Sequence, residues 1–187
     1  MKKAVFFDRD GTLLTLYEGT GYLTSTKGMR LMPGAAAAIA ACNMAGFLVL
    51  LHTNQANIAR GRLTEKDLHT IHTTIEKRLQ KAGAHIDGIY YCPHHPAGTV
   101  ERYRLVCECR KPEAGMLTTA IKEFGIDASK SFLVGDSRKD ILAGRRAGLN
   151  TLLVMTGNAG KEEGAPSIEP DFFVANISEA VRHILKK

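Results

Sequence analysis

Short apolar runs alternate along this chain with longer segments of helical character. The apolar runs occupy residues 4–7, 47–51, 88–91, 131–134, 151–154 and 171–174. Each run has the length of a buried strand. The segments of helical character occupy residues 34–45, 64–82, 113–124, 139–147 and 178–186. Strands and helices that alternate in this way form a parallel sheet with right-handed crossovers, so the sequence predicts a three-layer α/β sandwich.

The length and composition indicate one domain over residues 1–187. The chain is 44% hydrophobic and 24% charged, which is ordinary for a globular protein. The apolar start reaches a charge at Asp8 too early for a secretory signal, and no apolar run approaches the roughly 20 residues that span a bilayer. We therefore expect a cytoplasmic protein without a membrane partner. No apolar helix stripe is left over for an interface, so we expect a monomer.

The charge is basic but dispersed. Lys and Arg total 25 against 19 Asp and Glu, a net charge of +6, which is compatible with nucleic acid, anionic lipid or small phosphorylated substrates. A nucleic-acid surface usually carries a dense basic stripe with aromatic residues between the charges, and this chain has no such stripe. We expect a small-molecule substrate and no nucleic-acid partner.

Three stretches fit neither the strand nor the helix pattern. They occupy residues 15–32, 55–63 and 92–111. Each follows the end of a predicted strand, directly or after a few residues. Ligands bind beyond the carboxyl ends of strands in open α/β sheets, so these stretches are candidate substrate loops. None is long enough to form a large cap domain.

Two carboxylates follow the first predicted strand, in Asp8-Arg9-Asp10-Gly11-Thr12. A carboxylate at a strand end can attack phosphorus. A second carboxylate two residues later can protonate the leaving oxygen and then deprotonate the attacking water. Magnesium beside Asp8 would offset the repulsion between this nucleophile and an anionic substrate. The simpler alternative is an Asp-Gly turn that ends a strand.

Other strand ends supply groups that complement this pair. Thr53 follows the second strand and offers a hydroxyl to phosphate oxygens. Lys111 precedes Pro112, which is expected to begin a helix, and would act as a fixed cation. Asp136 and Asp140 follow the fourth strand, the first as a metal ligand and the second as its neighbour or as a helix cap. The four strand ends are consistent with one phosphoryl-transfer site.

These motifs, taken in order, resemble those of the haloacid dehalogenase (HAD) superfamily of phosphatases over nearly the whole chain. The resemblance implies a Rossmann-like, HAD-like fold with an aspartyl-phosphate formed on Asp8 and with Asp10 as general acid and base. It implies that Mg²⁺ is held by Asp8, by the carbonyl of Asp10 and by Asp136. Thr53 and Lys111 would steady the transferred phosphoryl group.

Three cysteines and a histidine fall close together in the chain, as Cys92, His94, Cys107 and Cys109. A Cys₃His set suits tetrahedral zinc, and four protein ligands favour a structural site because no position is left for water. His95 is an alternative fourth ligand, ranked below His94. We expect zinc to fix the shape of the 92–111 loop beside the active site.

The zinc loop and three further segments resemble the D-glycero-D-manno-heptose 1,7-bisphosphate phosphatase branch of the superfamily: Thr53-Asn54-Gln55, Ile58-Ala59-Arg60-Gly61 and Cys109-Arg110-Lys111-Pro112. That branch removes the 7-phosphate on the route to activated heptose for lipopolysaccharide or glycoprotein. By position, the resemblance implies substrate contacts from Gly21, Tyr22, Thr53, Asn54, Gln55, Ala56, Arg110 and Lys111. Arg110 would bind the phosphate that stays on the sugar, because its planar fork suits a phosphate.

The chain departs from the branch at two places. Ala56-Asn57 stand where Ser-Gly is usual, and Ser137 stands where some members carry Lys. Histidinol-phosphate phosphatases resemble the branch in the same motifs and zinc loop, so they are the nearest alternative. A polynucleotide 3′-phosphatase shares the aspartate motif and is a more remote one.

Overall fold

The structure is a computed structural model that describes residues 1–16, 23–164 and 166–187. Its centre is a sheet of six strands in the order β3-β2-β1-β4-β5-β6. The strands are β1 (Ala4–Asp8), β2 (Leu48–Asn54), β3 (Gly88–Cys92), β4 (Phe132–Gly135), β5 (Asn150–Val154) and β6 (Phe172–Val174). All neighbouring pairs run parallel, so the predicted parallel α/β fold is confirmed.

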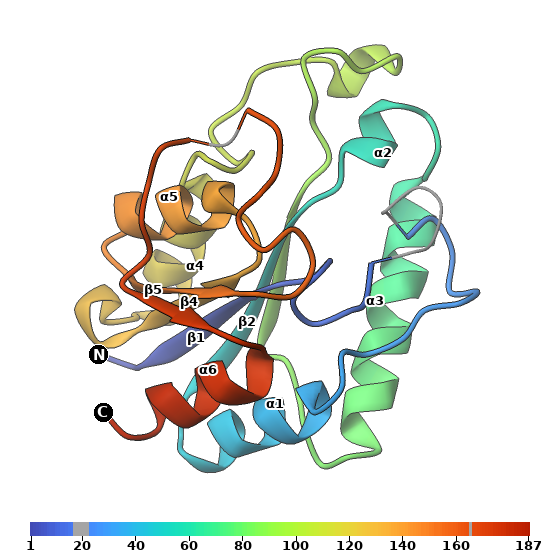
Figure 1. The fold of residues 1–187 in the computed structure, drawn as a ribbon. Coiled ribbons are helices and arrows are strands. Elements are labelled where there is room, and N and C mark those ends of the chain that lie inside the picture. The colour runs from blue at the N-terminus through green and yellow to red at the C-terminus, as the bar shows by residue number, and fades with distance from the viewer. Residues whose placement is uncertain (17–22, 165) are drawn as a thin grey trace.

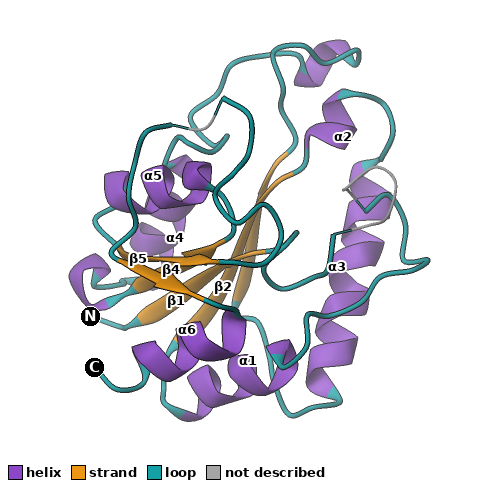
Figure 2. Ribbon diagram, in the orientation of Figure 1, coloured by secondary structure: helices purple, strands orange, loops and turns teal. Residues whose placement is uncertain are grey.

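Helices cover both faces of this sheet (Figures 1 and 2). They are α1 (Ala35–Met44), α2 (Ala56–Ala59), α3 (Glu65–Gln80), α4 (Gly115–Phe124), α5 (Arg138–Arg146) and α6 (Ile177–Ile184), with short 3₁₀ turns at Glu101–Tyr103 and Ala128–Lys130. α1, α3 and α6 lie on one face, and α4 and α5 lie on the other (Figure 2). This gives the three layers that the alternating pattern predicts. None of the described helices is both long and apolar enough to cross a membrane.

β1 lies in the middle of the sheet and is buried on both faces. All five of its residues are buried, as expected for a parallel strand with helices on either side. Val5 and Phe7 belong to the apolar core beneath α1, α3 and α6. Phe6 belongs to the second core, beneath α4 and α5. Packing in both cores holds β1 in place, so the position of Asp8 at the end of the strand is fixed.

The sequence predicts helix starts at Thr64 and at Pro112, and the structure confirms only the first. Thr64 caps α3, because its side chain accepts from the Asp67 amide at 3.1 Å and Asp67 bonds back to Thr64. The expectation that Pro112 begins a helix is wrong, since α4 begins at Gly115. Backbone bonds from Glu113 to Arg110 and from Gly115 to Glu108 fold this stretch into turns instead.

The stretch expected to be irregular after β2 contains one helical turn, α2, in residues 56–59. Four residues are too few for a helical period to appear in the sequence. Among the described residues, no separate domain covers the carboxyl edge of the sheet. The segments after β1, β2, β3, β4 and β5 border it directly (Figure 1).

Candidate active site

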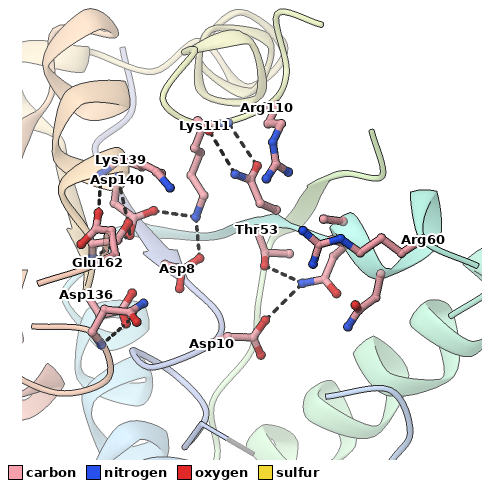
Figure 3. Close-up of a pocket in the computed structure, with 16 residues that line it drawn as sticks. Asp8, Asp10, Thr53, Arg60, Arg110, Lys111, Asp136, Lys139, Asp140 and Glu162 are labelled. Carbon is pink, nitrogen blue, oxygen red and sulfur yellow. Dashed lines mark hydrogen bonds and ion pairs between the residues drawn. The ribbon is translucent and has the colours of Figure 1, made fainter. Parts of the chain in front are cut away.

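A pocket opens at the carboxyl edge of the sheet (Figure 3). Among the described residues, it is lined by Asp8, Asp10, Thr53, Asn54, Gln55, Ala56, Asn57, Arg60, Arg110, Lys111, Asp136, Ser137, Lys139, Asp140, Asn158 and Glu162. The segments that follow β1, β2, β3, β4 and β5 all contribute side chains. The structure therefore brings the sequence-predicted residues of this set into one pocket, whereas Gly21 and Tyr22 lie outside the described residues.

Lys111 joins two of the carboxylates. Its Nζ lies 2.6 Å from Asp8 Oδ1 and 2.5 Å from Asp140 Oδ1, and all three side chains are buried. Burial alone would lower the pKa of Lys111, but Asp140 and Asp8 outweigh that effect and raise it. Asn54 fixes the lysine backbone with two bonds of 3.1 Å, one to its N–H and one to its carbonyl. The amide expected to contact substrate thus anchors Lys111.

Three carboxylates form a cluster suited to a divalent cation. Oxygens of Asp8, Asp136 and Asp140 lie within 4.8 Å of one another. Burial, and then repulsion by the neighbouring carboxylates, raises the pKa of Asp136 to about 8. Burial also raises the pKa of Asp8 to about 7, although Lys111 opposes the shift. Oxygen donors with unbalanced negative charge are the ligands that magnesium takes, so the residues fit this ion.

Asp140 is a helix cap as well as a neighbour of Lys111. Its Oδ2 accepts from the Ser137 backbone N–H at 3.1 Å, and its own amide donates to the Ser137 hydroxyl at 3.2 Å, which closes a capping box at the start of α5. Oδ2 also accepts from the Ser137 hydroxyl at 2.7 Å. Burial would raise the pKa of Asp140, but Lys111 and the bond from Ser137 help to hold it below its ordinary value. This carboxylate therefore stays ionised and positions the lysine.

The Asp136 carboxylate is held by a loop that the sequence did not single out. Asn158 donates to Asp136 Oδ2 from its backbone N–H at 2.6 Å and from its side chain at 2.9 Å. Gly11 and Gly157 approach the same carboxylate so closely that a Cβ would lie 2.3 Å and 2.1 Å from Oδ2. Their φ angles, +89° and +57°, also favour glycine. No periodicity marks such a loop contact in the sequence.

Asp10 lies in a separate network around Arg9, which the sequence also did not single out. Arg9 is fully buried and grips Asp10 with Nε at 3.1 Å and Nη2 at 2.8 Å. Gln55 accepts from Arg9 and donates to Asp10 Oδ2 at 3.2 Å and to Thr53 Oγ1 at 2.8 Å. His72 of α3 lies against Arg9, with 3.4 Å between Nε2 and Nη1. Arg9 and Gln55 thus orient the Asp10 carboxylate, which lies outside the cluster of Asp8, Asp136 and Asp140.

The four expected zinc ligands form a second cluster. One ligand atom from each of Cys92, His94, Cys107 and Cys109 lies within 4.8 Å of the others. Sγ of Cys107 is 3.5 Å from that of Cys92 and 3.2 Å from that of Cys109. These Sγ–Sγ distances are slightly shorter than the edges of about 3.8 Å expected around tetrahedral zinc with Zn–S bonds of ~2.3 Å. His95 stands apart, and its Nδ1 accepts from the Ala97 amide.

Comparisons with known proteins agree with this geometry. Residues 108–180 match the family model described as HAD-hydrolase-like. The chain is 44% identical over 165 residues to a Pasteurella multocida protein named D-glycero-beta-D-manno-heptose-1,7-bisphosphate 7-phosphatase, with 88% of each chain covered. It is 40% identical over 155 residues to the Escherichia coli K12 protein of the same name, covering 82% of this chain and 80% of that one.

A solved structure shows the same architecture. The D,D-heptose 1,7-bisphosphate phosphatase from B. bronchiseptica, complexed with magnesium and phosphate, superposes with a TM-score of 0.84 at 30% identity, and 98% of each chain is covered. The fold, the sequence identity and the site thus point the same way. The chain belongs to the D-glycero-β-D-manno-heptose-1,7-bisphosphate 7-phosphatase family of HAD-like hydrolases.

Proposed function

We propose that this protein removes the 7-phosphate of D-glycero-D-manno-heptose 1,7-bisphosphate through an aspartyl-phosphate on Asp8. The observation that carries the proposal is the convergence of Asp8, Thr53, Lys111 and Asp136 on one pocket, with Asp10 on its wall. The substrate is the one named for relatives that match over four fifths or more of this chain. The pathway that we propose is heptose activation, for lipopolysaccharide or for another nucleotide-activated glycan.

In the first step, Asp8 attacks the phosphorus of the 7-phosphate. The bond from the carboxylate oxygen to phosphorus forms while the bond from phosphorus to the sugar oxygen breaks, and Asp10 gives that oxygen its proton. Lys111 lies 2.6 Å from Asp8, so its ammonium group is placed to balance the charge that develops on the phosphoryl oxygens. The Thr53 hydroxyl would contact the same group.

In the second step, water attacks the phosphorus and Asp10 takes its proton. As the oxygen of water bonds to phosphorus, the bond between phosphorus and Asp8 breaks. Inorganic phosphate is released, and the Asp8 carboxylate is regenerated. Arg9 and Gln55 hold Asp10 in one orientation, so the same oxygen pair can serve both proton transfers. Asp10 must both give up and take up a proton, whereas Asp8 must attack as an ionised carboxylate. The two side chains therefore need different surroundings.

Two metals complete the proposal. Asp8, Asp136 and the carbonyl of Asp10 would hold Mg²⁺, which would screen the nucleophile and substrate from each other. The four Cys and His residues of the second cluster would hold a structural zinc and leave no open position for catalysis. Arg110 donates to the His94 carbonyl at 3.2 Å, so a rigid zinc loop would also fix the arginine that is proposed to bind the 1-phosphate.

The nucleophile is tested by Asp8→Asn. The variant keeps the size of the side chain but removes its nucleophilic oxygen pair, so we expect turnover to fall by roughly 10³-fold or more, as when other covalent catalysts lose their nucleophile. Phosphate release measures the activity, and circular dichroism checks the fold. Folded Asp8→Asn protein with activity near that of the wild type would refute the assignment.

The substrate is tested by comparing three compounds in the presence of Mg²⁺: the heptose 1,7-bisphosphate, the heptose 7-phosphate and histidinol phosphate. We expect the bisphosphate to have the highest kcat/KM. Faster turnover of histidinol phosphate would reverse the choice between the two enzyme classes, and the comparisons do not favour that outcome. We further propose that the protein acts in the cytoplasm, because three of its four cysteines gather as candidate metal ligands and not as disulfides. We also propose that it acts as a monomer.

A further inference from the structure

The charges of the pocket divide into a buried inner set and a half-buried outer set. The inner set contains Asp8, Asp136, Asp140 and Lys111, all buried. With one magnesium ion, three carboxylates and one ammonium group balance to about zero. The inner set therefore has no excess positive charge with which to bind a second anion.

The outer set contains three cations and one carboxylate: Arg60, Arg110, Lys139 and Glu162. All four side chains are only partly buried. Their formal charges leave two positive charges in excess, the charge that one phosphate dianion would neutralise. In the described part of the chain, the ion pairs involve other cations, so these three carry no bound carboxylate.

The three cations come from different elements. Arg60 ends α2, Lys139 lies in the first turn of α5, and Arg110 follows the zinc ligand Cys109. Figure 3 shows all three around the same opening, above the level of Asp10. All three side chains line the same pocket as Asp8 and Lys111.

Arg110 is held through its guanidinium group, and Lys139 through its backbone amide. Arg110 donates to the His94 carbonyl at 3.2 Å, and the Lys139 amide donates to Glu162 Oε1 at 3.2 Å. Ser137, the departure noted in the sequence, is occupied by the Asp140 cap and offers no charge to the pocket. Lys139 is the residue of α5 that supplies a cation on this side instead.

We propose that Arg60 and Lys139 join Arg110 in a second anion subsite, which binds the phosphate that is not transferred and thereby selects bisphosphorylated sugars. The inference rests on the proposed function and adds two specificity residues to it. Arg60 offers a planar fork and Lys139 a compact point charge, so together with Arg110 they can contact different oxygens of one phosphate.

The test compares Arg60→Gln and Lys139→Met with two control variants of the same kind, Arg62→Gln and Lys122→Met. Both control residues are exposed and do not line the pocket. The measured quantity is the ratio of kcat/KM for the heptose 1,7-bisphosphate to kcat/KM for the heptose 7-phosphate. Loss of one charge-assisted bond at a half-exposed site should lower this ratio about five- to tenfold, whereas each control should keep it within about twofold.

A binding measurement separates this inference from the proposed reaction. The same substitutions are placed in Asp8→Asn protein, and calorimetry gives Kd for the bisphosphate without turnover. We expect Kd to rise about fivefold or more with Lys139→Met or Arg60→Gln relative to the controls. Ratios and Kd values equal to those of the controls would overturn the subsite. If the wild type hydrolysed neither sugar and the rise in Kd persisted, the reaction would be wrong and the subsite would stand.

Discussion

At the scale of single residues, Arg9 shows what the sequence could and could not predict. Asp8 and Asp10 follow an apolar run, so their place at a strand end could be inferred from the pattern. Arg9 stands between them and would ordinarily be taken for a solvated side chain. It is fully buried because α3 packs over it and brings His72 into contact. Such burial depends on distant packing that no local pattern contains.

Replacement of Arg9 should affect both stability and catalysis. Arg9→Met removes the forked partner of Asp10 and leaves a nearly buried carboxylate without its charge partner. We predict a fall of about 3 kcal/mol in the free energy of unfolding, the cost typical of breaking a buried pair, and a fall in kcat. Urea unfolding and phosphate release measure the two effects. Arg9→Lys keeps the charge but not the forked guanidinium, so its free energy of unfolding should lie between those of the wild type and Arg9→Met. An unchanged free energy of unfolding in Arg9→Met would contradict the prediction.

His72 should make stability depend on pH. Burial, and then Arg9, lowers the pKa of His72 to about 3 from 6.5. The folded protein thus keeps this ring neutral, while the unfolded chain takes up a proton below about pH 6.5, so stability is lost as pH falls. Between pH 7 and pH 5, wild type should lose about 1–2 kcal/mol more than His72→Gln. Parallel unfolding curves at the two pH values measure this, and equal losses would contradict it.

At the scale of elements, regular segments could be predicted and irregular ones could not. The strands and the start of α3 follow from apolar runs and from the Thr64 cap. The start of α4 did not follow from Pro112, because the turns before it depend on backbone bonds to Glu108 and Arg110. The Asn158 contact was missed for a similar reason, since it belongs to a loop whose shape is set by its neighbours.

The Gly157 turn gives a test at this scale. Gly157→Ala would place a methyl group 2.1 Å from Asp136 Oδ2 at a φ of +57°. Gly164 has a similar φ of +65° and nothing within 4 Å of its absent Cβ, so Gly164→Ala carries the same backbone strain without the collision. We predict that Gly157→Ala weakens Mg²⁺ binding by roughly tenfold or more, the effect typical of disturbing the surroundings of a metal ligand, and that Gly164→Ala does not. Magnesium titration of activity distinguishes the two; equal midpoints would contradict the prediction.

At the scale of the whole molecule, the cluster of three cysteines and His94 links a peripheral loop to the pocket. Cys107→Ser should remove one ligand and the metal, loosen the loop and release Arg110 from its fixed position. We predict loss of about one zinc ion per chain by metal analysis, faster proteolysis within residues 93–111, and a KM for the bisphosphate that rises more than the KM for the monophosphate. Cys42→Ser is the control, because Cys42 is buried in α1 away from the cluster. Zinc retention with unchanged KM values would count against this coupling.

The place of β1 in the sheet has a consequence for how the enzyme comes into being. Asp8, the proposed nucleophile, lies on β1, yet one neighbour of that strand is β4, more than a hundred residues later in the chain. Asp136 is held by Asn158, later still. During synthesis the Asp8 carboxylate is therefore made well before the groups that surround it in the fold, and the proposed chemistry can begin only after β4 and the loop that contains Asn158 have been made and have packed against β1.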